Sequence, residues 1–203
     1  IVSPADYQQG ESVRIMYIHV PAAWLALSSY LGLGACALLY LIWRHPLADI
    51  AARAVAPIGC GFAGLTLITG SLWGYPTWGT WWVWDARITS MLILLFLYLG
   101  VVAMFEAYEN KTAAARACAV LSLVGMVNIP IIYKSVDWWY SLHQPASIKF
   151  TGSSAIDASM LYPLLGMIIT FYALFALLMM LNLKQSLTEE YAQSAWLNKR
   201  LTA

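Results

Sequence analysis

The sequence predicts an all-α integral membrane protein, a single membrane domain over residues 1–203 that forms a bundle of five transmembrane helices. Of the 203 residues, 61% are hydrophobic and 10% are charged, whereas an average soluble domain has about 45–50% apolar and about 25% charged residues. The few charges also leave five long windows without any charged residue. The net charge of +1 leaves no basic patch for nucleic acid, and the hydrophobicity excludes intrinsic disorder.

The five charge-free windows contain 29, 31, 18, 17 and 26 residues in chain order. Because a helix needs about 20 apolar residues to cross about 30 Å of hydrocarbon, each window can supply one span. The predicted spans are residues 20–43, 54–72, 88–105, 117–133 and 160–183. The fourth span is the weakest, since it is short and contains Asn128 and Pro130, which are tolerated where neighbouring helices satisfy the backbone. A large soluble protein could bury one such helix, but five leave too little polar chain to cover them.

The Lys and Arg residues predict the orientation of the bundle. One side has the N-terminal segment and the loops 73–87 and 134–159, with four of these cations: Arg14, Arg87, Lys134 and Lys149. The other side has two shorter loops and the tail 184–203, with seven: Arg44, Arg53, Lys111, Arg116, Lys184, Lys199 and Arg200. The positive-inside rule makes the second side cytoplasmic and the first external. An external N-terminus without a signal peptide predicts a sixth, upstream span that is missing from this chain.

Seven of the ten Trp lie in the two external loops. Five of them lie in the stretch W-G-Y-P-T-W-G-T-W-W-V-W-D-A-R at residues 73–87: Trp73, Trp78, Trp81, Trp82 and Trp84. The other two are Trp138 and Trp139. An aromatic belt explains Trp at helix ends, but it should appear on both faces of the membrane. We interpret the 73–87 loop as a folded aromatic platform for a flat, apolar ligand.

Two of the three His, His19 and His143, lie on the same external side as the Trp residues. Ionisable residues at a membrane boundary are functional candidates, although either imidazole could be a hydrogen-bonded structural residue. Two imidazoles beside many indoles suit haem, whose iron takes axial His nitrogens. Arg14 and Arg87 are candidates for binding the two propionates, or they simply flank the interface. We expect Asp85 to pair with Arg87 or to cap the next helix.

Longer motifs are similar to one protein family. The stretch W-G-T-W-W-V-W-D-A-R-I-T at residues 78–89 closely resembles the Trp-rich WWD signature of haem-handling proteins in cytochrome c biogenesis. Three further stretches resemble the bacterial CcmC family: P-A-D-Y-Q-Q-G at 4–10, R-I-M-Y-I-H-V-P-A-A at 14–23 and V-N-I-P-I-I-Y-K-S-V-D-W-W-Y-S-L-H-Q at 127–144. The resemblance covers the chain from about residue 4 to at least residue 183.

This resemblance implies a six-span protein of the bacterial inner membrane, with the Trp-rich loop in the periplasm and one N-terminal span more than this chain has. It implies that His19 and His143 are the axial ligands of a non-covalent b-type haem. It also implies a haem-binding and haem-transfer function rather than an enzyme. The protein would present haem to the chaperone CcmE and would work with CcmD and with the ABC transporter formed by CcmA and CcmB.

The residues therefore favour a haem clamp at the external membrane boundary. We expect His19 and His143 to bind the iron from opposite faces, and the five Trp of the 73–87 loop to line the shelf. The alternative is a transporter or channel with an aromatic substrate vestibule, which would need polar residues inside the spans. A structural subunit of a respiratory complex is a further alternative, but it gives no reason for two His and seven Trp on one face.

Overall fold

The computed structural model describes residues 3–143 and 156–201, and it describes side chains as far as residue 192. Lys149, most of the external loop 134–159 beyond His143, and the side chains of Lys199 and Arg200 lie outside the described part.

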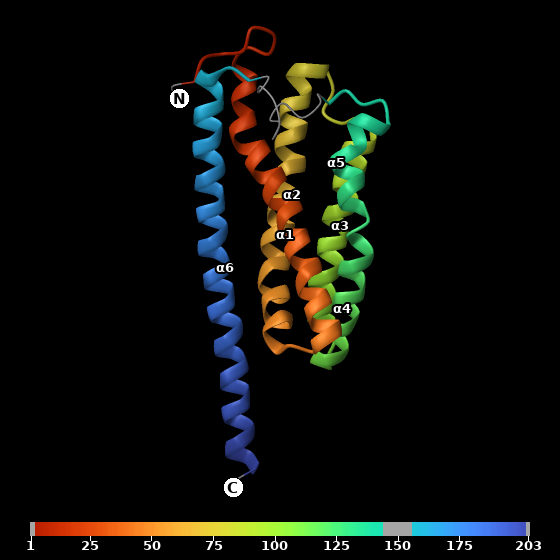
Figure 1. Ribbon diagram of the computed structural model, residues 1–203, viewed down its shortest axis with the longest axis vertical. Coiled ribbons are helices and arrows are strands. Elements are labelled where there is room, and N and C mark those ends of the chain that lie inside the picture. Colours follow the sequence, from red (N-terminus) through yellow and green to blue (C-terminus); the bar gives the residue numbers. More distant parts are fainter. Residues whose placement is uncertain (1–2, 144–155, 202–203) are drawn as a thin grey trace.

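The described residues form six α-helices (Figure 1). In chain order they are α1 (Met16–Trp43, preceded by the 3-10 turn η1, Glu11–Ile15), α2 (Pro46–Trp78), α3 (Ala86–Ala107), α4 (Lys111–Gly125), α5 (Asn128–Trp138) and α6 (Ala158–Leu201). Five helical segments of the described chain are long and apolar enough to cross a membrane: Glu11–Trp43, Pro46–Trp78, Ala86–Ala107, Lys111–Trp138 and Ala158–Ala192. The predicted all-α membrane fold is therefore confirmed.

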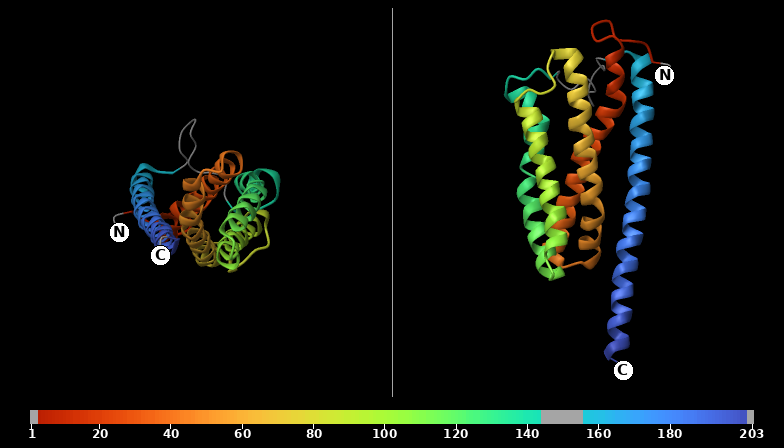
Figure 2. Two further views of the ribbon diagram at one scale, coloured as in Figure 1. Left: turned by 90° about the horizontal axis from the view of Figure 1, so that it is seen from below. Right: turned by 180° about the vertical axis from the view of Figure 1, so that it is seen from behind.

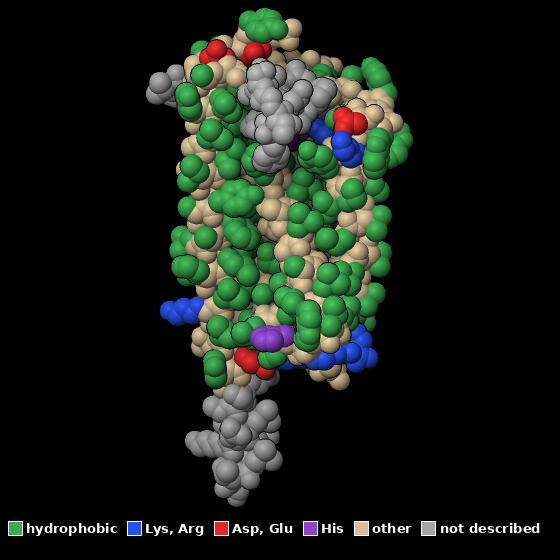
Figure 3. All heavy atoms as spheres, in the orientation of Figure 1, with side chains coloured by type: hydrophobic (Ala, Val, Ile, Leu, Met, Phe, Trp, Pro, Cys, Tyr) green, Lys and Arg blue, Asp and Glu red, His purple; other side chains and the backbone are tan. Residues whose placement is uncertain are grey.

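The helices run roughly along one axis, so the bundle has two ends (Figures 1 and 2). One end carries the N-terminal segment and the ends of α2 and α5, and the other carries the α1–α2 and α3–α4 connections. Helix α1 packs against α2, α4 and α6, and α3 packs against α2, α4 and α5. Helix α6 lies at the edge against α1 and α2; its 44 residues make it about 66 Å long, so it extends beyond the bundle. Figure 3 shows hydrophobic side chains over the outer surface between two ends that carry the charges. Such a surface suits contact with lipid rather than water.

Small residues allow α1 and α2 to pack closely. Ala22 and Ala26 on α1 and Ala56 and Ala63 on α2 are fully buried, with no exposed surface. Small residues at helix contacts let backbones approach, which is how membrane helices gain packing energy. The α1–α2 pair is the most extensive helix contact in the described bundle, and it fixes the relative height of every residue along these two helices.

Tyr98 of α3 locks the third helix onto this pair. Its side chain is fully buried and its hydroxyl donates a 2.8 Å hydrogen bond to the carbonyl of Ala26. Its ring packs edge-on against Tyr30, with the ring centroids 4.9 Å apart. A Cβ at Gly59 would overlap the Tyr98 ring, so glycine is required at this position of α2.

The fourth span is divided into α4 and α5, which the sequence analysis did not predict. Pro130 has no N–H to donate to the carbonyl of Met126, four residues earlier. The N–H of Ile129 donates to that carbonyl instead, at 3.1 Å. The N–H groups of Met126 and Val127 each donate to the carbonyl three residues earlier in the chain. This tighter 3-10 pattern satisfies the backbone at the break, while the Asn128 amide donates to the Ser90 carbonyl at 2.8 Å.

Helix α2 is longer than predicted, so the stretch 73–87 is only partly a loop. Gly79, with φ 76°, ends the helix in the left-handed conformation that favours glycine, and Trp73 and Trp78 therefore lie on α2. Gly74 is part of this helix and leaves room for the Trp78 ring, which lies 3.2 Å from where its Cβ would be. Helix α5 likewise continues to Trp138 in the predicted second external loop.

We predict that Gly59→Ala lowers the stability of the folded protein, because the new methyl group overlaps the immobile Tyr98 ring. Overpacking of this kind costs about 1–3 kcal/mol. Thermal unfolding in detergent micelles, followed by circular dichroism, measures the effect. The matched control is Gly61→Ala on the same helix, where no atom lies within 4 Å of the new Cβ. A Gly59→Ala protein as stable as this control would contradict the predicted packing.

Candidate functional site

The candidate site lies at the end of the bundle that carries the N-terminal segment, the end of α2 and the end of α5 (Figure 1). His19 is in the first turn of α1, and His143 is in the irregular segment after α5. Two rings of α2 link the histidines, because Trp73 contacts His19 and Trp78 contacts His143. Arg87 lies two residues after Asp85, which is hydrogen-bonded to His143. The structure thus brings together three of the predicted site residues, from distant parts of the sequence.

The His19 ring is oriented by helix α2. Its Nδ1 lies 3.0 Å from the Thr69 hydroxyl oxygen, and that hydroxyl donates to the carbonyl of Leu65 at 2.7 Å. Since the Thr69 proton is used there, its oxygen accepts from the Nδ1–H of His19. This tautomer leaves the Nε2 lone pair of His19 available for a ligand. Gly70 permits the close approach, because a Cβ there would lie 3.1 Å from His19 Cε1.

The His143 ring is oriented by a carboxylate. Its Nδ1 lies 2.8 Å from Asp85 Oδ2, and the Ser141 hydroxyl donates to the same oxygen. Asp85 also caps α3 by accepting from the Ile88 N–H at 2.8 Å, which confirms the predicted helix cap. Its described partner is His143, through a hydrogen bond, and no described salt bridge joins it to Arg87. A metal-binding imidazole commonly donates its other N–H to a carboxylate in this way.

The pKa shifts of His143 and Asp85 favour a hydrogen bond from a neutral imidazole to an ionised carboxylate at neutral pH. Burial lowers the pKa of His143 below its usual value, although the hydrogen bond to Asp85 and the charge of Asp85 partly counteract the effect. Burial raises the pKa of Asp85, but hydrogen bonds from Ser141, the Ile88 N–H and His143 outweigh it and hold the pKa below the usual value. His143 is therefore neutral and Asp85 ionised at pH 7, which leaves the Nε2 lone pair of His143 available.

Two Trp residues pack directly against the histidines. Trp73 contacts His19 edge-on, with ring centroids 5.8 Å apart, and its Nε1 donates to Gln9 Oε1 at 2.8 Å. Trp78 contacts His143 edge-on at 4.7 Å. These rings restrict the orientation of the imidazoles, so their role is support as much as ligand contact.

The remaining predicted Trp residues lie in two aromatic pairs, in which Trp81 and Trp84 are exposed and Trp82 is half-buried. Trp81 stacks on Tyr75 with ring centroids 4.4 Å apart and 14° between the ring planes. Trp82 and Trp84 pack edge-on at 5.4 Å. Trp81 is 54% exposed and Trp84 74% exposed, so both offer ring faces to a ligand. Burial of such faces is worth far more than the edge contacts that hold them.

The two predicted Arg residues differ in their surroundings. Arg87 donates through Nε to the buried Ser135 hydroxyl at 3.1 Å and through Nη2 to the Tyr133 carbonyl at 3.4 Å, which keeps its charge near the histidines. Arg14 forms an ion pair with Glu11 and donates to the Ser3 carbonyl at 3.1 Å. The described contacts do not bring Arg14 to the histidines or the Trp rings.

The sequence analysis missed the residues that support the site. These are Thr69, Gly70, Tyr75 and Ser141, together with the role of Asp85 beside His143. One signal was available, because Thr69 and Trp73 are four residues apart and so face the same side of a helix. Tyr75 is six residues from Trp81. The contacts of Thr69 with His19 and of Ser141 with Asp85 join residues 50 or more positions apart, where no local pattern indicates them.

The donor set fits a metal that brings its own equatorial ligands. Among the described residues no three His, Cys, Asp or Glu side chains gather into a metal site. Two imidazoles are enough to complete the coordination of an iron whose other ligands come from a macrocycle. The exposed aromatic rings and the nearby Arg87 suit a flat apolar ring with anionic substituents. The residues present therefore fit haem.

Comparisons with known proteins identify relatives over almost the whole chain. The family model described as "Heme exporter protein C" matches residues 1–198. "Heme exporter protein C" of Bradyrhizobium diazoefficiens is 52% identical over 193 residues, which is 95% of this chain and 73% of the relative. The protein of the same name from Escherichia coli is 44% identical over 197 residues, 97% of this chain and 79% of the relative. That of Haemophilus influenzae is also 44% identical.

We predict that Asp85→Asn lowers the pKa of His143 further in the ligand-free protein. Asn still caps α3, but it removes the negative charge that raises the His143 pKa. NMR titration of protein with labelled His measures the pKa. Asp137→Asn is the control, since Asp137 is exposed at the same end and pairs with Lys134. A His143 pKa that is unchanged or raised in Asp85→Asn would show that this carboxylate does not act on the ring.

Proposed function

The chain belongs to the Heme exporter protein C family, and we propose that it binds haem at the external, periplasmic face of the bacterial inner membrane and presents it to the chaperone CcmE. Its family ties the protein to haem handling in cytochrome c maturation, and its five apolar helices fit a multi-pass membrane protein. The finer parts of the proposal, namely the ligands, the partners and the orientation, rest on the geometry of the site.

The observation that carries the proposal is that both histidines are hydrogen-bonded through Nδ1. His19 and His143 each have Nδ1 engaged by an oxygen acceptor, Thr69 Oγ1 in one case and Asp85 Oδ2 in the other. Each imidazole then offers Nε2 as the axial ligand of a non-covalent b-type haem.

The surrounding residues have separate tasks in this proposal. Trp81, Trp82 and Trp84 provide the aromatic surface for the macrocycle, while Trp73 and Trp78 hold the imidazoles. Arg87 provides the cation for a propionate. Arg14 is the second proposed propionate cation, and its ion pair with Glu11 would have to open for this contact. The protein acts through binding and orientation, so we propose a haem carrier rather than an enzyme.

Haem is the cargo of this protein, and its reactivity comes from the porphyrin and the iron. The chain's own residues hold both axial positions, which prevents oxygen or peroxide from reaching the metal. They also bury part of the ring against indole side chains. Trp138, Trp139 and Tyr140 are exposed beside the segment that carries His143, and we propose this aromatic surface as the contact for CcmE.

The charges at the opposite end support the proposed orientation. This end carries most of the described Lys and Arg residues, namely Arg44, Arg53, Lys111, Arg116 and Lys184. The positive-inside rule assigns such an end to the cytoplasm. The ATPase subunit CcmA would then meet the protein on this side, and CcmB and CcmD would meet it within the membrane.

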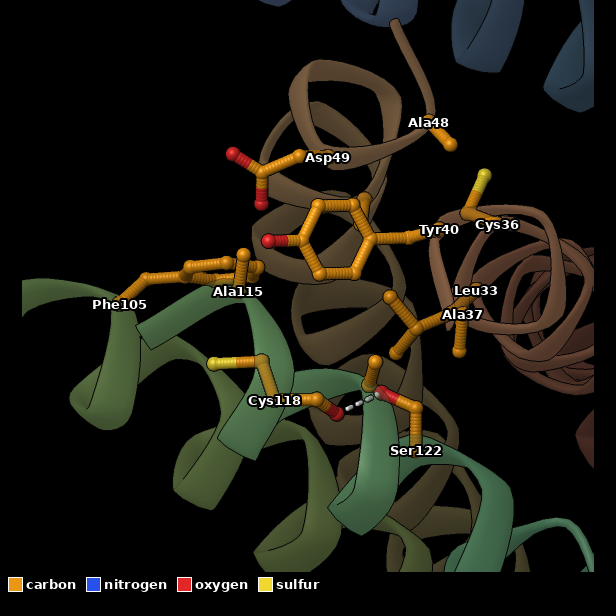
Figure 4. A pocket seen from close by; sticks show the side chains of 12 residues that line it. Leu33, Cys36, Ala37, Tyr40, Ala48, Asp49, Phe105, Ala115, Cys118 and Ser122 are labelled. Atoms are coloured by element: carbon orange, nitrogen blue, oxygen red, sulfur yellow. Dashed lines mark hydrogen bonds between the residues drawn. The ribbon is translucent and has the colours of Figure 1, made fainter. Parts of the chain in front are cut away.

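The interior of the bundle argues against a transporter or channel. Buried Thr66 and Ser122 donate to carbonyls of their own helices at 2.8 and 2.7 Å, so they use their hydroxyls locally. The cavity between α1, α2, α3 and α4 near the opposite end (Figure 4) has a volume of only about 10 Å³, room for about one water. Asp49, at its wall, is paired with Arg53 at 3.0 Å.

We predict that His19→Ala combined with His143→Ala abolishes the Soret band of the purified protein, because both axial ligands are lost. Each single variant should keep a weakened, shifted band, and added imidazole should restore the original spectrum by filling the vacated axial position. Visible absorption spectra in nanodiscs measure these effects. The control is His45→Ala, since His45 precedes α2 at the opposite end of the bundle. A double variant that keeps the parental Soret band would contradict the proposal. So would a parent protein that contains no haem when it is purified from haem-replete membranes.

We also predict that Asp85→Asn weakens haem binding by about 10-fold to 100-fold, the usual effect of removing a carboxylate behind a metal-binding imidazole. Titration of haem into protein in nanodiscs, followed at the Soret maximum, gives the affinity. Asp137→Asn is again the control at the same end. Parental affinity in Asp85→Asn would exclude Asp85 as a support of the axial ligand.

A further inference from the structure

An open groove lies on the outer surface at the end opposite the histidines. It has a volume of about 840 Å³, within the range of small-molecule sites. Its lining residues come from the end of α3, the connection to α4 and α4 itself: Met104, Tyr108, Asn110, Thr112, Ala113, Arg116, Ala117, Val120, Leu121 and Val124. The groove therefore runs from one end of the bundle towards its middle.

The two ends of this groove differ in chemistry. Asn110, Thr112 and Arg116 lie at the end of the bundle and add an amide, a hydroxyl and a guanidinium. Val120 and Val124 lie farther along α4 and are 51% and 64% exposed. A ligand that fits must therefore have a polar head at the bundle end and an apolar tail directed towards the middle.

The polar end of the groove is lined by one cation, Arg116, while the exposed Glu106 and Glu109 flank the same connection between α3 and α4 without lining the groove. Arg116 is exposed, and the described residues give it no ion pair or hydrogen bond. No Asp or Glu is among the lining residues. The neighbouring Lys111 is different, because it pairs with Glu190 of α6 at 3.0 Å. Arg116 thus offers a guanidinium whose geometry matches the oxygens of a phosphate.

The length of the groove fits one membrane leaflet. Helix α4 rises about 12 Å from Arg116 to Val124 at 1.5 Å per residue. Half of the hydrocarbon core of a bilayer is about 15 Å thick. A headgroup at Arg116 would therefore place an acyl chain along Val120 and Val124 at the depth that lipid tails occupy.

We propose that this groove is a binding site for an anionic phospholipid. Arg116 binds the phosphate, Asn110 and Thr112 contact the headgroup, and an acyl chain lies along Val120, Leu121 and Val124. The site is separate from the haem site, because α3 begins at the histidines and ends at the groove. It would fix an anionic lipid of the leaflet at this end to the junction of α3 and α4.

The experiment compares phosphatidylglycerol with phosphatidylcholine. Protein is reconstituted in nanodiscs that contain both lipids, and native mass spectrometry counts the lipids that stay bound after release. We expect preferential retention of phosphatidylglycerol, reduced about fivefold by Arg116→Gln, the factor that corresponds to about 1 kcal/mol for one cation near an anionic membrane surface. Lys184→Gln, an exposed cation on α6 outside the groove, should leave retention unchanged.

Two further variants separate charge from shape. Arg116→Lys keeps the charge and should lose less retention than Arg116→Gln. Val124→Trp fills the groove, keeps Arg116 and should also reduce retention. Equal retention of the two lipids, or equal effects of Arg116→Gln and Lys184→Gln, would overturn the proposal. Circular dichroism confirms that each variant is folded before it is compared.

The occupant is identified in intact membranes. A photoreactive p-benzoylphenylalanine replaces Val120, and illumination links it to whatever lies in the groove of the assembled protein. A phospholipid adduct that Arg116→Gln weakens supports the proposal. An adduct to another protein subunit instead would overturn it and would identify the groove as a subunit interface.

Discussion

The close packing of α1 against α2 is the contact on which the rest of the structure depends. Alanines on both helices are buried without any exposed surface, so the two backbones approach as far as a methyl group allows. This packing sets the height of His19 on α1 relative to Thr69 and Gly70 on α2. A shift by one helical turn, about 5.4 Å, would remove the hydrogen-bond acceptor from the imidazole. The chemistry at one end therefore depends on packing that extends through the whole bundle.

The sequence predicted the features that local patterns encode. Charge spacing indicated the five spans, and the position of Asp85 before an apolar run indicated a helix cap, which the structure confirms. His19 and His143 could be placed on one side because both follow from the same count of spans. This part of the prediction needed only the length of an apolar helix and the direction of the chain.

The sequence could not indicate contacts made across helices. The pairing of Asp85 with His143 joins residues 58 positions apart, and it depends on where α5 ends. The division of the fourth span lies at Pro130, which has no N–H, and its form depends on a rearrangement of neighbouring N–H groups. The end of α2 was likewise ambiguous, because Gly74 and Gly79 could each have ended the helix and of the two it is Gly79 that has a positive φ.

The two histidines are attached to the protein in unequal ways. His19 belongs to a helix that packs against three other helices. His143 lies in irregular chain after α5, where Asp85, the Ser141 hydroxyl and the edge of the Trp78 ring contact it. A metal centre bound between them would be coordinated by one imidazole fixed in the helix bundle and by one on irregular chain, so its two sides would not be equivalent.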